Sequence, residues 1–318
     1  MPLNGWFERN AFHPIWMALL VLALGFVLFQ FVVAPLVGLI FLAVEMGRMP
    51  TLVEFSEGFQ TNGAMMLTAN SLGQFIGFAL LAVVVSRLHS SAGSEFLRAR
   101  GGAATGFVLA AVGWAALYPA VMWVGQLNAS VQLPETLRTL EQMQEDMIEG
   151  LLLGNTLSTP ALLIAFAVTP AICEELLFRG YLQRQVERSW GTLASLLVVG
   201  VVFGAYHLRF STLLPLSLLG VYLGFVVWVT GSVWAGALVH LLNNGLAVLL
   251  TSGARIDPDF DPSVYEDATV PWYFGVASLI AAAVLAWLLL RYRRSVVGDA
   301  EDSQPAPLLQ STPLTDPS

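Results

Sequence analysis

Lysine is absent from the sequence, and charge of either sign is scarce. All 14 basic residues are arginine, and charged residues make up only 11% of the 318 positions. A soluble domain carries about a quarter charged residues, so the composition argues against one. The formal net charge of −8 gives no basis for nucleic-acid binding. The lack of lysine indicates a biased, GC-rich genome, which is typical of a bacterium.

Cysteine is nearly absent as well, because Cys173 is the single one in the chain. An intramolecular disulfide is therefore excluded. A lone cysteine in an apolar segment is usually a small buried hydrophobe, and nothing nearby would favour its thiolate. A thiol protease that uses Cys173 as nucleophile is a weak alternative.

Long apolar runs are abundant, and hydrophobic residues make up 56% of the chain. A membrane-crossing helix needs about 20 mainly apolar residues. Eight runs approach that length, over residues 14–44, 64–86, 104–126, 160–188, 191–208, 212–229, 231–251 and 271–292. We therefore predict an all-α, polytopic membrane protein with one transmembrane domain over residues 1–298. The polar Pro/Ser/Thr-rich residues 299–318 are predicted to form a disordered tail.

The arginine distribution predicts how the chain is oriented in the membrane. With both termini in the cytoplasm, ten of the 14 arginines fall in inside segments and four in outside loops. Positive residues favour the cytoplasmic side. We expect a multi-pass protein of a bacterial plasma membrane with both termini cytoplasmic.

The segment between the third and fourth runs has a different pattern. Apolar residues recur at three- and four-residue intervals between acids, at Leu137, Leu140, Met143 and Met147. This spacing predicts an amphipathic helix over residues 134–153 that lies at the outer surface. A solvated connector helix is the alternative.

The fourth run carries charge at membrane depth. Its uncharged part, Pro160–Cys173, has 14 residues and is too short to cross the bilayer alone. The helix must therefore continue through Glu174, Glu175 and Arg179, and each intramembrane ionisable residue is a functional hypothesis. Glu175 and Arg179 are four residues apart with the acid first, the favoured order for an ion pair. Glu174 points about 100° away and is left for proton chemistry.

Two more polar sets lie at similar depth, His207 in "FGAYH" and His240 with Asn244 in "HLLNN". At about 1.5 Å per residue, Glu174 and His207 lie roughly 21 and 24 Å from the inner ends of their helices. His240 and Asn244 lie at roughly 14 and 20 Å. We predict that the four side chains share one layer in a bundle of spans four to seven. A carboxylate with a histidine can activate water, and a second histidine with an amide can stabilise an oxyanion.

The ordered motifs EExxxR, FxxxH and HxxxN, over about residues 160–250, resemble the CPBP intramembrane proteases. That family includes the CAAX prenyl endopeptidases and the abortive-infection and bacteriocin-processing relatives. The resemblance implies an intramembrane endopeptidase that acts on a peptide or membrane-protein tail. A prenylated substrate is not expected in a bacterium.

The resemblance also implies a role for each motif residue. Glu174 matches the water-activating glutamate, with His207 as its partner. His240 and Asn244 match the oxyanion-stabilising pair. Glu175 and Arg179 match the supporting ion pair.

Three questions stay open at this point. The family is often described as metalloproteases, and a Glu/His/His set is compatible with zinc, although the chain has no HExxH motif and Asn244 is a poor zinc ligand. A proton-coupled transporter would also place acids and histidines in the membrane, but it should show inverted repeats. A catalytically idle scaffold or immunity protein of the same fold is the third alternative.

Overall fold

The computed structural model describes residues 2–153, 157–253 and 269–302, and in these ranges all regular secondary structure is helical. The N-terminal helices are α1 (Trp6–Arg9), α2 (Pro14–Val27), α3 (Ala34–Met46), α4 (Leu52–Thr61), α5 (Gly63–Gln74), α6 (Leu81–His89) and α7 (Gly93–Phe96). The later helices are α8 (Ala104–Ala129), α9 (Glu135–Leu153), α10 (Thr159–Leu163), α11 (Thr169–Glu175), α12 (Gln183–Tyr206), α13 (Leu213–Thr230), α14 (Val233–Thr251) and α16 (Trp272–Asp302).

Several of these helices are joined end to end by short π-helical segments. The π segments are η1 (Leu28–Val33), η2 (Phe75–Leu80), η3 (Ile164–Val168) and η4 (Leu176–Leu182), and a 3₁₀ turn, η5 (Phe210–Thr212), precedes α13. π-helical segments are rare in proteins overall, and those that do occur are often found at functional sites. Two of them, η3 and η4, flank the helix that ends at Glu175.

Seven helices in the described ranges are long and apolar enough to cross a membrane. One of them, Thr159–Tyr206, has 48 residues, whereas roughly 20 suffice for one crossing. The chain turns back inside this segment at Gly191, where φ is 82°, a conformation that glycine adopts without strain. The fourth and fifth predicted runs are the two arms of this segment. The prediction of an all-α polytopic membrane protein is confirmed.

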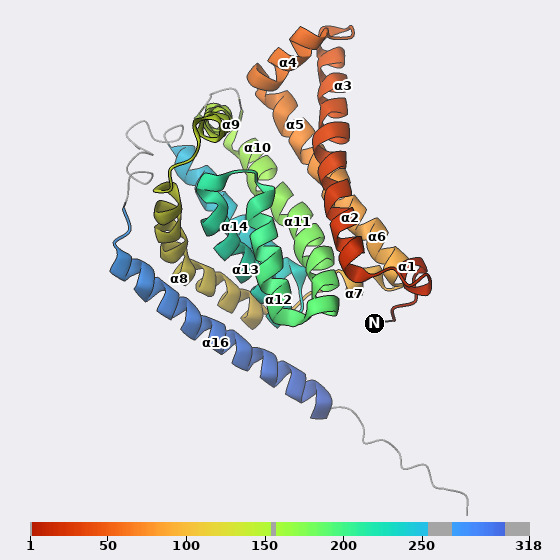
Figure 1. Cartoon of the computed structure of the whole chain (residues 1–318), viewed down its shortest axis with the longest axis vertical. Helices are drawn as coiled ribbons and strands as arrows, with labels where there is room; N and C mark the ends of the chain where they lie inside the picture. Colours follow the sequence, from red (N-terminus) through yellow and green to blue (C-terminus); the bar gives the residue numbers. More distant parts are fainter. Residues whose placement is uncertain (1, 154–156, 254–268, 303–318) are drawn as a thin grey trace, which may run out of the picture.

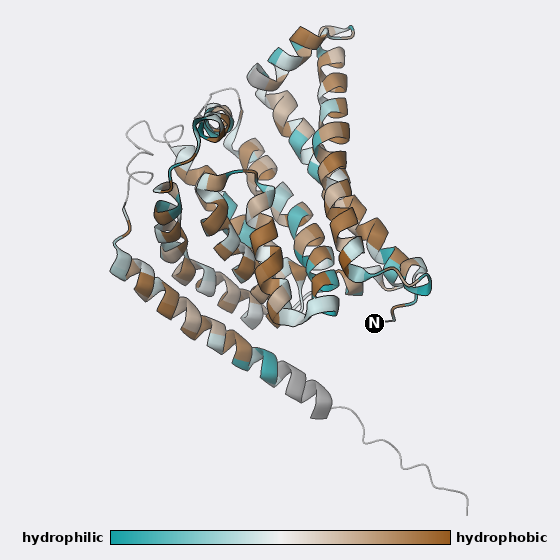
Figure 2. Ribbon diagram, viewed as in Figure 1, coloured by the Kyte–Doolittle hydropathy of each residue, from teal (hydrophilic) through white to brown (hydrophobic). Residues whose placement is uncertain are grey.

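The helices form two groups (Figure 1). The rods α2–α3 and α5–α6 lie side by side and contact the central bundle through α2 on α12 and η2 on α11. They diverge from the bundle toward the end where α4 and α9 lie (Figure 1). Hydrophobic residues cover α16 and the α2–α3 rod along most of their lengths, as expected for lipid-facing helices (Figure 2).

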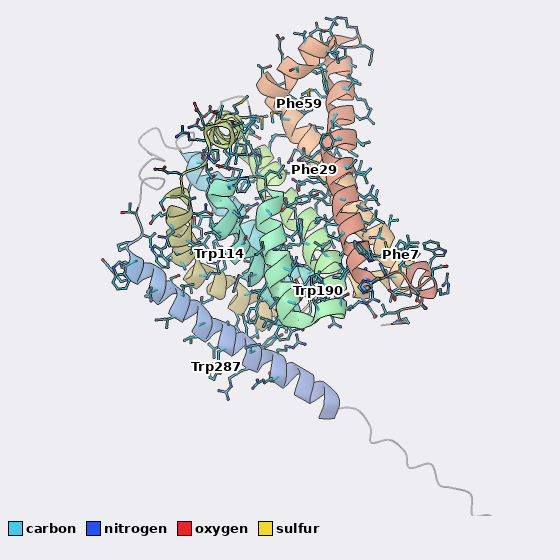
Figure 3. The ribbon with its side chains drawn as sticks, viewed as in Figure 1. Phe7, Phe29, Phe59, Trp114, Trp190 and Trp287 are labelled. Atoms are coloured by element: carbon cyan, nitrogen blue, oxygen red, sulfur yellow. The ribbon has the colours of Figure 1, made fainter. Side chains whose placement is uncertain are left out.

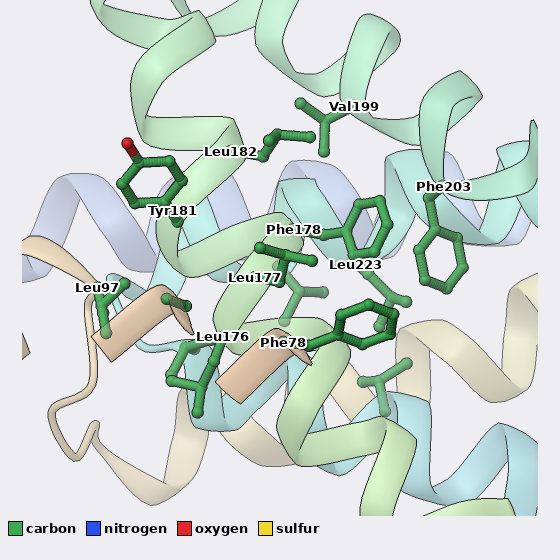
Figure 4. Close-up of a cluster of buried hydrophobic side chains, with 14 of the residues drawn as sticks. Phe78, Leu97, Leu176, Leu177, Phe178, Tyr181, Leu182, Val199, Phe203 and Leu223 are labelled. Carbon is green, nitrogen blue, oxygen red and sulfur yellow. The ribbon is translucent and has the colours of Figure 1, made fainter. Parts of the chain in front are cut away.

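The core lies where the two groups meet (Figure 4). Phe78 from η2, Phe178 from η4 and Phe203 from α12 are each at most 2% exposed. The rings of Phe178 and Phe203 are perpendicular, with centroids 5.3 Å apart. This aromatic layer fixes η4 against α12 and so positions both motif segments.

The structure also tests where two of the predicted segments begin and end. The helix α9, Glu135–Leu153, matches the predicted helix over residues 134–153, and its Leu140 and Met143 are 59% and 64% exposed. The helix α16 continues to Asp302, past the predicted end of the transmembrane domain at residue 298. Residues 303–318 lie outside the described residues, so the disorder of the tail stays a prediction.

Close packing of α12 on α13 depends on small residues. A Cβ at Gly204 would lie 2.7 Å from the backbone oxygen of Leu213 and 2.9 Å from the nitrogen of Ser217. A Cβ at Gly200 would lie 2.8 Å from the nitrogen of Val221. Small residues at such spacing let membrane helices approach closely. The arm of α12 that ends at His207 is therefore held by backbone contact.

We predict that Gly204→Ala destabilises the protein by about 1–3 kcal/mol, because the backbone atoms opposite cannot move aside as a side chain would. The free energy of unfolding in detergent micelles measures this change. Gly150→Ala is the matched control, since a Cβ added there would face open space. Equal stability of Gly204→Ala and wild type would contradict the packing account.

Candidate active site

A fully buried ion pair forms the base of the site. Glu175 and Arg179 have no exposed side-chain surface, and the Arg179 Nη1 donates to Glu175 Oε1 over 2.8 Å. This is the pair that their spacing predicts. The Arg179 Nη2 donates to the backbone oxygen of Gly220 over 3.1 Å. The pair therefore ties η4 to α13.

The same glutamate also holds a histidine of α14. His240 lies with its Nδ1 2.9 Å from Glu175 Oε1, so the ring donates there. The helix can approach because residue 236 is glycine, where a Cβ would lie 2.8 Å from Glu175 Oε2. Glu175 thus links three helical segments and has a structural task.

Glu174 has a different environment from its neighbour. Its side chain is 13% exposed, and its Oε2 lies 4.0 Å from the Nε2 of His240. That Oε2 has no hydrogen-bond partner among the described residues. Because the Nδ1 of His240 donates to Glu175, a neutral ring presents a lone pair at Nε2. The gap between Nε2 and Oε2 therefore suits a molecule that donates to both.

His207 is oriented by its own helix. Its Nδ1 lies 2.8 Å from the backbone oxygen of Phe203, which can only accept, so the neutral ring has its lone pair on Nε2. Within the described ranges, no hydrogen bond or ion pair joins His207 to Glu174, so their partnership stays a prediction. Tyr206, the preceding residue, lies close enough to Glu174 to interact with it electrostatically. Its hydroxyl has no partner among the described residues.

The position of Phe203 in the site was not predicted from the sequence. Its ring centroid lies 5.0 Å from that of His207 and 5.7 Å from that of His240. The guanidinium carbon of Arg179 lies 4.1 Å from the same centroid. The first position of FxxxH was the available signal. Phe203 separates the two histidines and covers the buried charge.

Asn244 is held by a chain of hydrogen bonds that was not predicted from the sequence. Trp114 Nε1 donates to Asn243 Oδ1 over 3.3 Å, and Asn243 Nδ2 donates to Asn244 Oδ1 over 3.2 Å. Asn244 Nδ2 in turn donates to the backbone oxygen of Phe166 over 3.1 Å. One N–H of the Asn244 amide is then left for another acceptor. The adjacent asparagines in "HLLNN" were the signal for this chain.

The segment that holds these residues matches a known family. Residues 156–246 match the protein-family model described as type II CAAX prenyl endopeptidase Rce1-like. The chain contains an Rce1-like domain. No curated protein and no solved structure matches the chain. The match confirms the resemblance to the CPBP family and includes all six predicted site residues, whereas α1–α9 and α16 lie outside it.

The side chains of the Rce1-like domain are not arranged as a metal site. In the described parts of the chain, no three His, Cys, Asp or Glu side chains are grouped as metal ligands. A structural or catalytic zinc ion is held by three or four such ligands around one point, so the residues as arranged do not fit a zinc ion.

Cys173 is fully buried in the core cluster. A substrate cannot reach its sulfur in this arrangement. Its position beside Glu174 reflects packing, as expected for a lone cysteine.

A cavity of about 640 Å³ adjoins the Rce1-like domain. It lies between the diverging rods and α9, where Phe29 and Phe59 mark one wall (Figure 3). Phe166, whose backbone oxygen accepts from Asn244, is part of the lining. The described residues that line the cavity are all uncharged; they are Phe29, Gln30, Ala34, Phe55, Ser56, Phe59, Met66, Leu67, Ala69, Asn70, Gln144, Met147, Ile148, Leu151 and Phe166. The cavity therefore suits an apolar, uncharged ligand.

The helix α9 is fastened over this end of the domain by acids. Glu141, 7% exposed, accepts hydrogen bonds from the backbone nitrogens of Phe210 and Ser211 over 2.5 and 3.2 Å. Glu145 forms an ion pair of 3.2 Å with Arg209. Burial raises the pKa of Glu141, but the hydrogen bonds and Arg209 outweigh it, so its pKa is below the usual range. These contacts hold α9 to the loop that follows His207.

We predict that Arg179→Met destabilises the protein by about 3–5 kcal/mol, because Glu175 is left as a buried charge without the guanidinium that neutralises it. The double variant Glu175→Gln/Arg179→Met should lose less stability than Arg179→Met alone, since neither residue of the pair then carries a buried charge. Unfolding free energies in detergent give the comparison. Additive losses from the two single changes would show that the pair is not coupled.

We predict that acid loosens α9. A carboxyl with a lowered pKa stabilises the fold fully above its unfolded value of about 4.3, and this contribution is lost as the pH falls through the folded value. Hydrogen exchange of α9 and η5, corrected for intrinsic rates, should increase below that pH in wild type. In Glu141→Gln the hydrogen-exchange rate of α9 and η5 should be raised already at neutral pH. Glu145→Gln, which alters an exposed ion pair, is the control and should change little. Unchanged protection in Glu141→Gln would refute this role.

Proposed function

We propose that the chain is an intramembrane endopeptidase that hydrolyses a peptide bond with activated water. The observation that carries the proposal is the environment of Glu174. Its Oε2 has no described partner and faces His240 Nε2 at 4.0 Å inside a membrane-spanning bundle. Glu175 Oε2 likewise has no described partner, but Glu175 differs in that its Oε1 accepts from both Arg179 and His240. A carboxylate left unpaired at this depth is costly without a function.

In the proposed mechanism, Glu174 accepts a proton from a water molecule placed between it and the histidines. His207 orients this water through Nε2, whose lone pair accepts the second water hydrogen. The hydroxide attacks the carbonyl carbon of the substrate and gives a tetrahedral oxyanion. Glu174 then returns the proton to the departing amine nitrogen, as general acid–base catalysis requires.

Asn244 and His240 stabilise the oxyanion in this proposal. Asn244 supplies the N–H that Phe166 does not use. His240 donates from Nε2 when both ring nitrogens carry protons, and Glu175 at Nδ1 is the partner that such a cation needs. Removal of a single oxyanion donor typically lowers the rate by about 10²–10³.

The proposed substrate is a peptide or membrane-protein segment with apolar side chains. The uncharged cavity next to Asn244 would hold the residues beside the cut bond. Its amides, from Gln30, Asn70 and Gln144, can pair with the backbone of an extended segment. By the positive-inside rule, we place the arginine-rich end of the bundle in the cytoplasm of a bacterium.

We predict that Glu174→Gln abolishes cleavage while the protein stays folded and inserted, because the amide cannot accept the proton. Membrane proteomes from cells with wild type or Glu174→Gln should differ by at least one truncated membrane protein. Cys173→Ala is the matched control at the neighbouring position and should preserve that product. If Glu174→Gln is inserted normally, yields every truncated product and restores a deletion phenotype, a carrier or scaffold function replaces the protease.

A further inference from the structure

Four arginines from three parts of the chain meet at the end of the bundle opposite His207. Arg98 and Arg100 lie in the loop after α7, Arg184 in the first turn of α12, and Arg293 in the second half of α16. Arg98 lies close enough to Arg184 and Arg293 for the charges to interact. Arg184 interacts with Arg100 in the same way. This group is called the arginine cluster below.

The carboxylate of Glu187 faces the arginine cluster. Glu187 Oε2 accepts from Arg98 Nη2 over 2.6 Å and lies 4.0 Å from Arg184 Nη1. Glu187 also interacts with the charge of Arg293. Among the described residues, Arg98, Arg100 and Arg293 together outnumber the carboxylate of Glu187, so positive charge is in excess here. Such an excess attracts an anion.

The loop that carries the cluster has a defined backbone. The backbone oxygen of Arg98 accepts from the nitrogen of Val233 over 2.9 Å, and that of Arg100 accepts from Ser232 Oγ over 2.5 Å. Arg100 Nε donates to the oxygen of Gly231 over 3.2 Å. Arg98 has a φ of 54°, which is uncommon for a residue other than glycine. Backbone strain of this kind persists only where the surroundings impose it.

Arg98 is the residue that points to a missing ligand. It is 8% exposed, and its Nη1 has no hydrogen-bond partner among the described residues. A buried donor left unpaired costs free energy, and more so when it is charged. Burial lowers the pKa of Arg98 to about 10; Glu187 opposes this effect, while Arg184 and Arg293 add to it. A negatively charged acceptor would pair with this donor and would also offset the cost of burying the Arg98 charge.

The surroundings of the cluster indicate where this acceptor comes from. Arg293 donates to the backbone oxygen of Trp228 and lies 4.0 Å from its ring centroid. Trp190 and Trp287, at the same end of the molecule, are 57% and 52% exposed (Figure 3). Tryptophan and arginine side chains together are typical of the membrane–water interface. The cluster therefore lies at the depth of lipid headgroups.

We propose that the arginine cluster binds the phosphate group of an anionic phospholipid. Guanidinium groups match phosphate oxygens in both geometry and charge. Basic pockets between membrane helices bind anionic headgroups by the same means. The bound lipid would connect α16, which lies outside the Rce1-like match, to the first turn of α12. This site is independent of the proposed protease activity.

Native mass spectrometry of the detergent-purified full chain tests the site. Wild type should bind phosphatidylglycerol more tightly than phosphatidylcholine of the same acyl chains. Arg184→Gln/Arg293→Gln should weaken phosphatidylglycerol binding by about fivefold for each arginine removed. Arg293→Lys keeps the positive charge but loses the two-pronged guanidinium group. Its affinity for phosphatidylglycerol should therefore fall between those of wild type and Arg293→Gln. Arg291→Gln, an exposed position on the same helix, should bind as wild type does.

Further measurements distinguish lipid binding from binding of a free phosphate ion, and a loss of binding from a loss of folding. Millimolar inorganic phosphate should not displace the lipid; displacement would show that the site takes the free ion, which overturns the proposal. Gel filtration and thermal unfolding establish whether the variants fold. If the double variant does not fold, the single variant Arg293→Gln takes its place in the binding measurement. Equal binding of the two lipids to wild type, or an unchanged preference in the glutamine variants, would also overturn it.

Discussion

The carboxylate of Glu175 is the contact on which the rest of the site depends. One oxygen accepts from Arg179 and from His240, so a single group joins η4 and α14, while Arg179 continues to α13 through Gly220. All three side chains are at most 2% exposed. A buried charge set of this kind is strongly destabilised when one partner is lost, which is the property that fixes the helices in one arrangement. The fixed arrangement then leaves Glu174, the preceding residue, with an oxygen near His240 that has no partner among the described residues.

Much of the architecture followed from residue patterns. Apolar run lengths predicted the spans, and the break between the fourth and fifth runs coincides with Gly191, the residue whose backbone allows the reversal. The pairing of Glu175 with Arg179 followed from helix geometry alone, because both residues lie on one continuous helical segment. The family resemblance, drawn from three short motifs, is confirmed by the match over residues 156–246.

Other parts of the site depend on how separate helices are rotated about their axes, which local patterns do not specify. His240 was paired with Asn244 by spacing, whereas in the structure its Nδ1 is directed at Glu175 and Asn244 is held through Asn243 and Phe166. The place of Phe203 between the two histidines requires α12 and α14 to be set against η4. The cavity depends on the divergence of two distant helical rods from the bundle, a long-range property.

In the proposed protease, the cavity presents a peptide to Glu174. Photo-crosslinking from Met66, which lines the cavity, tests it most directly. In a Glu174→Gln background, the adduct should contain an intact membrane protein or peptide, and in the wild-type background the same adduct should be shortened at a defined bond. Identical intact adducts in both backgrounds, or no adduct from the cavity in either, would contradict the account.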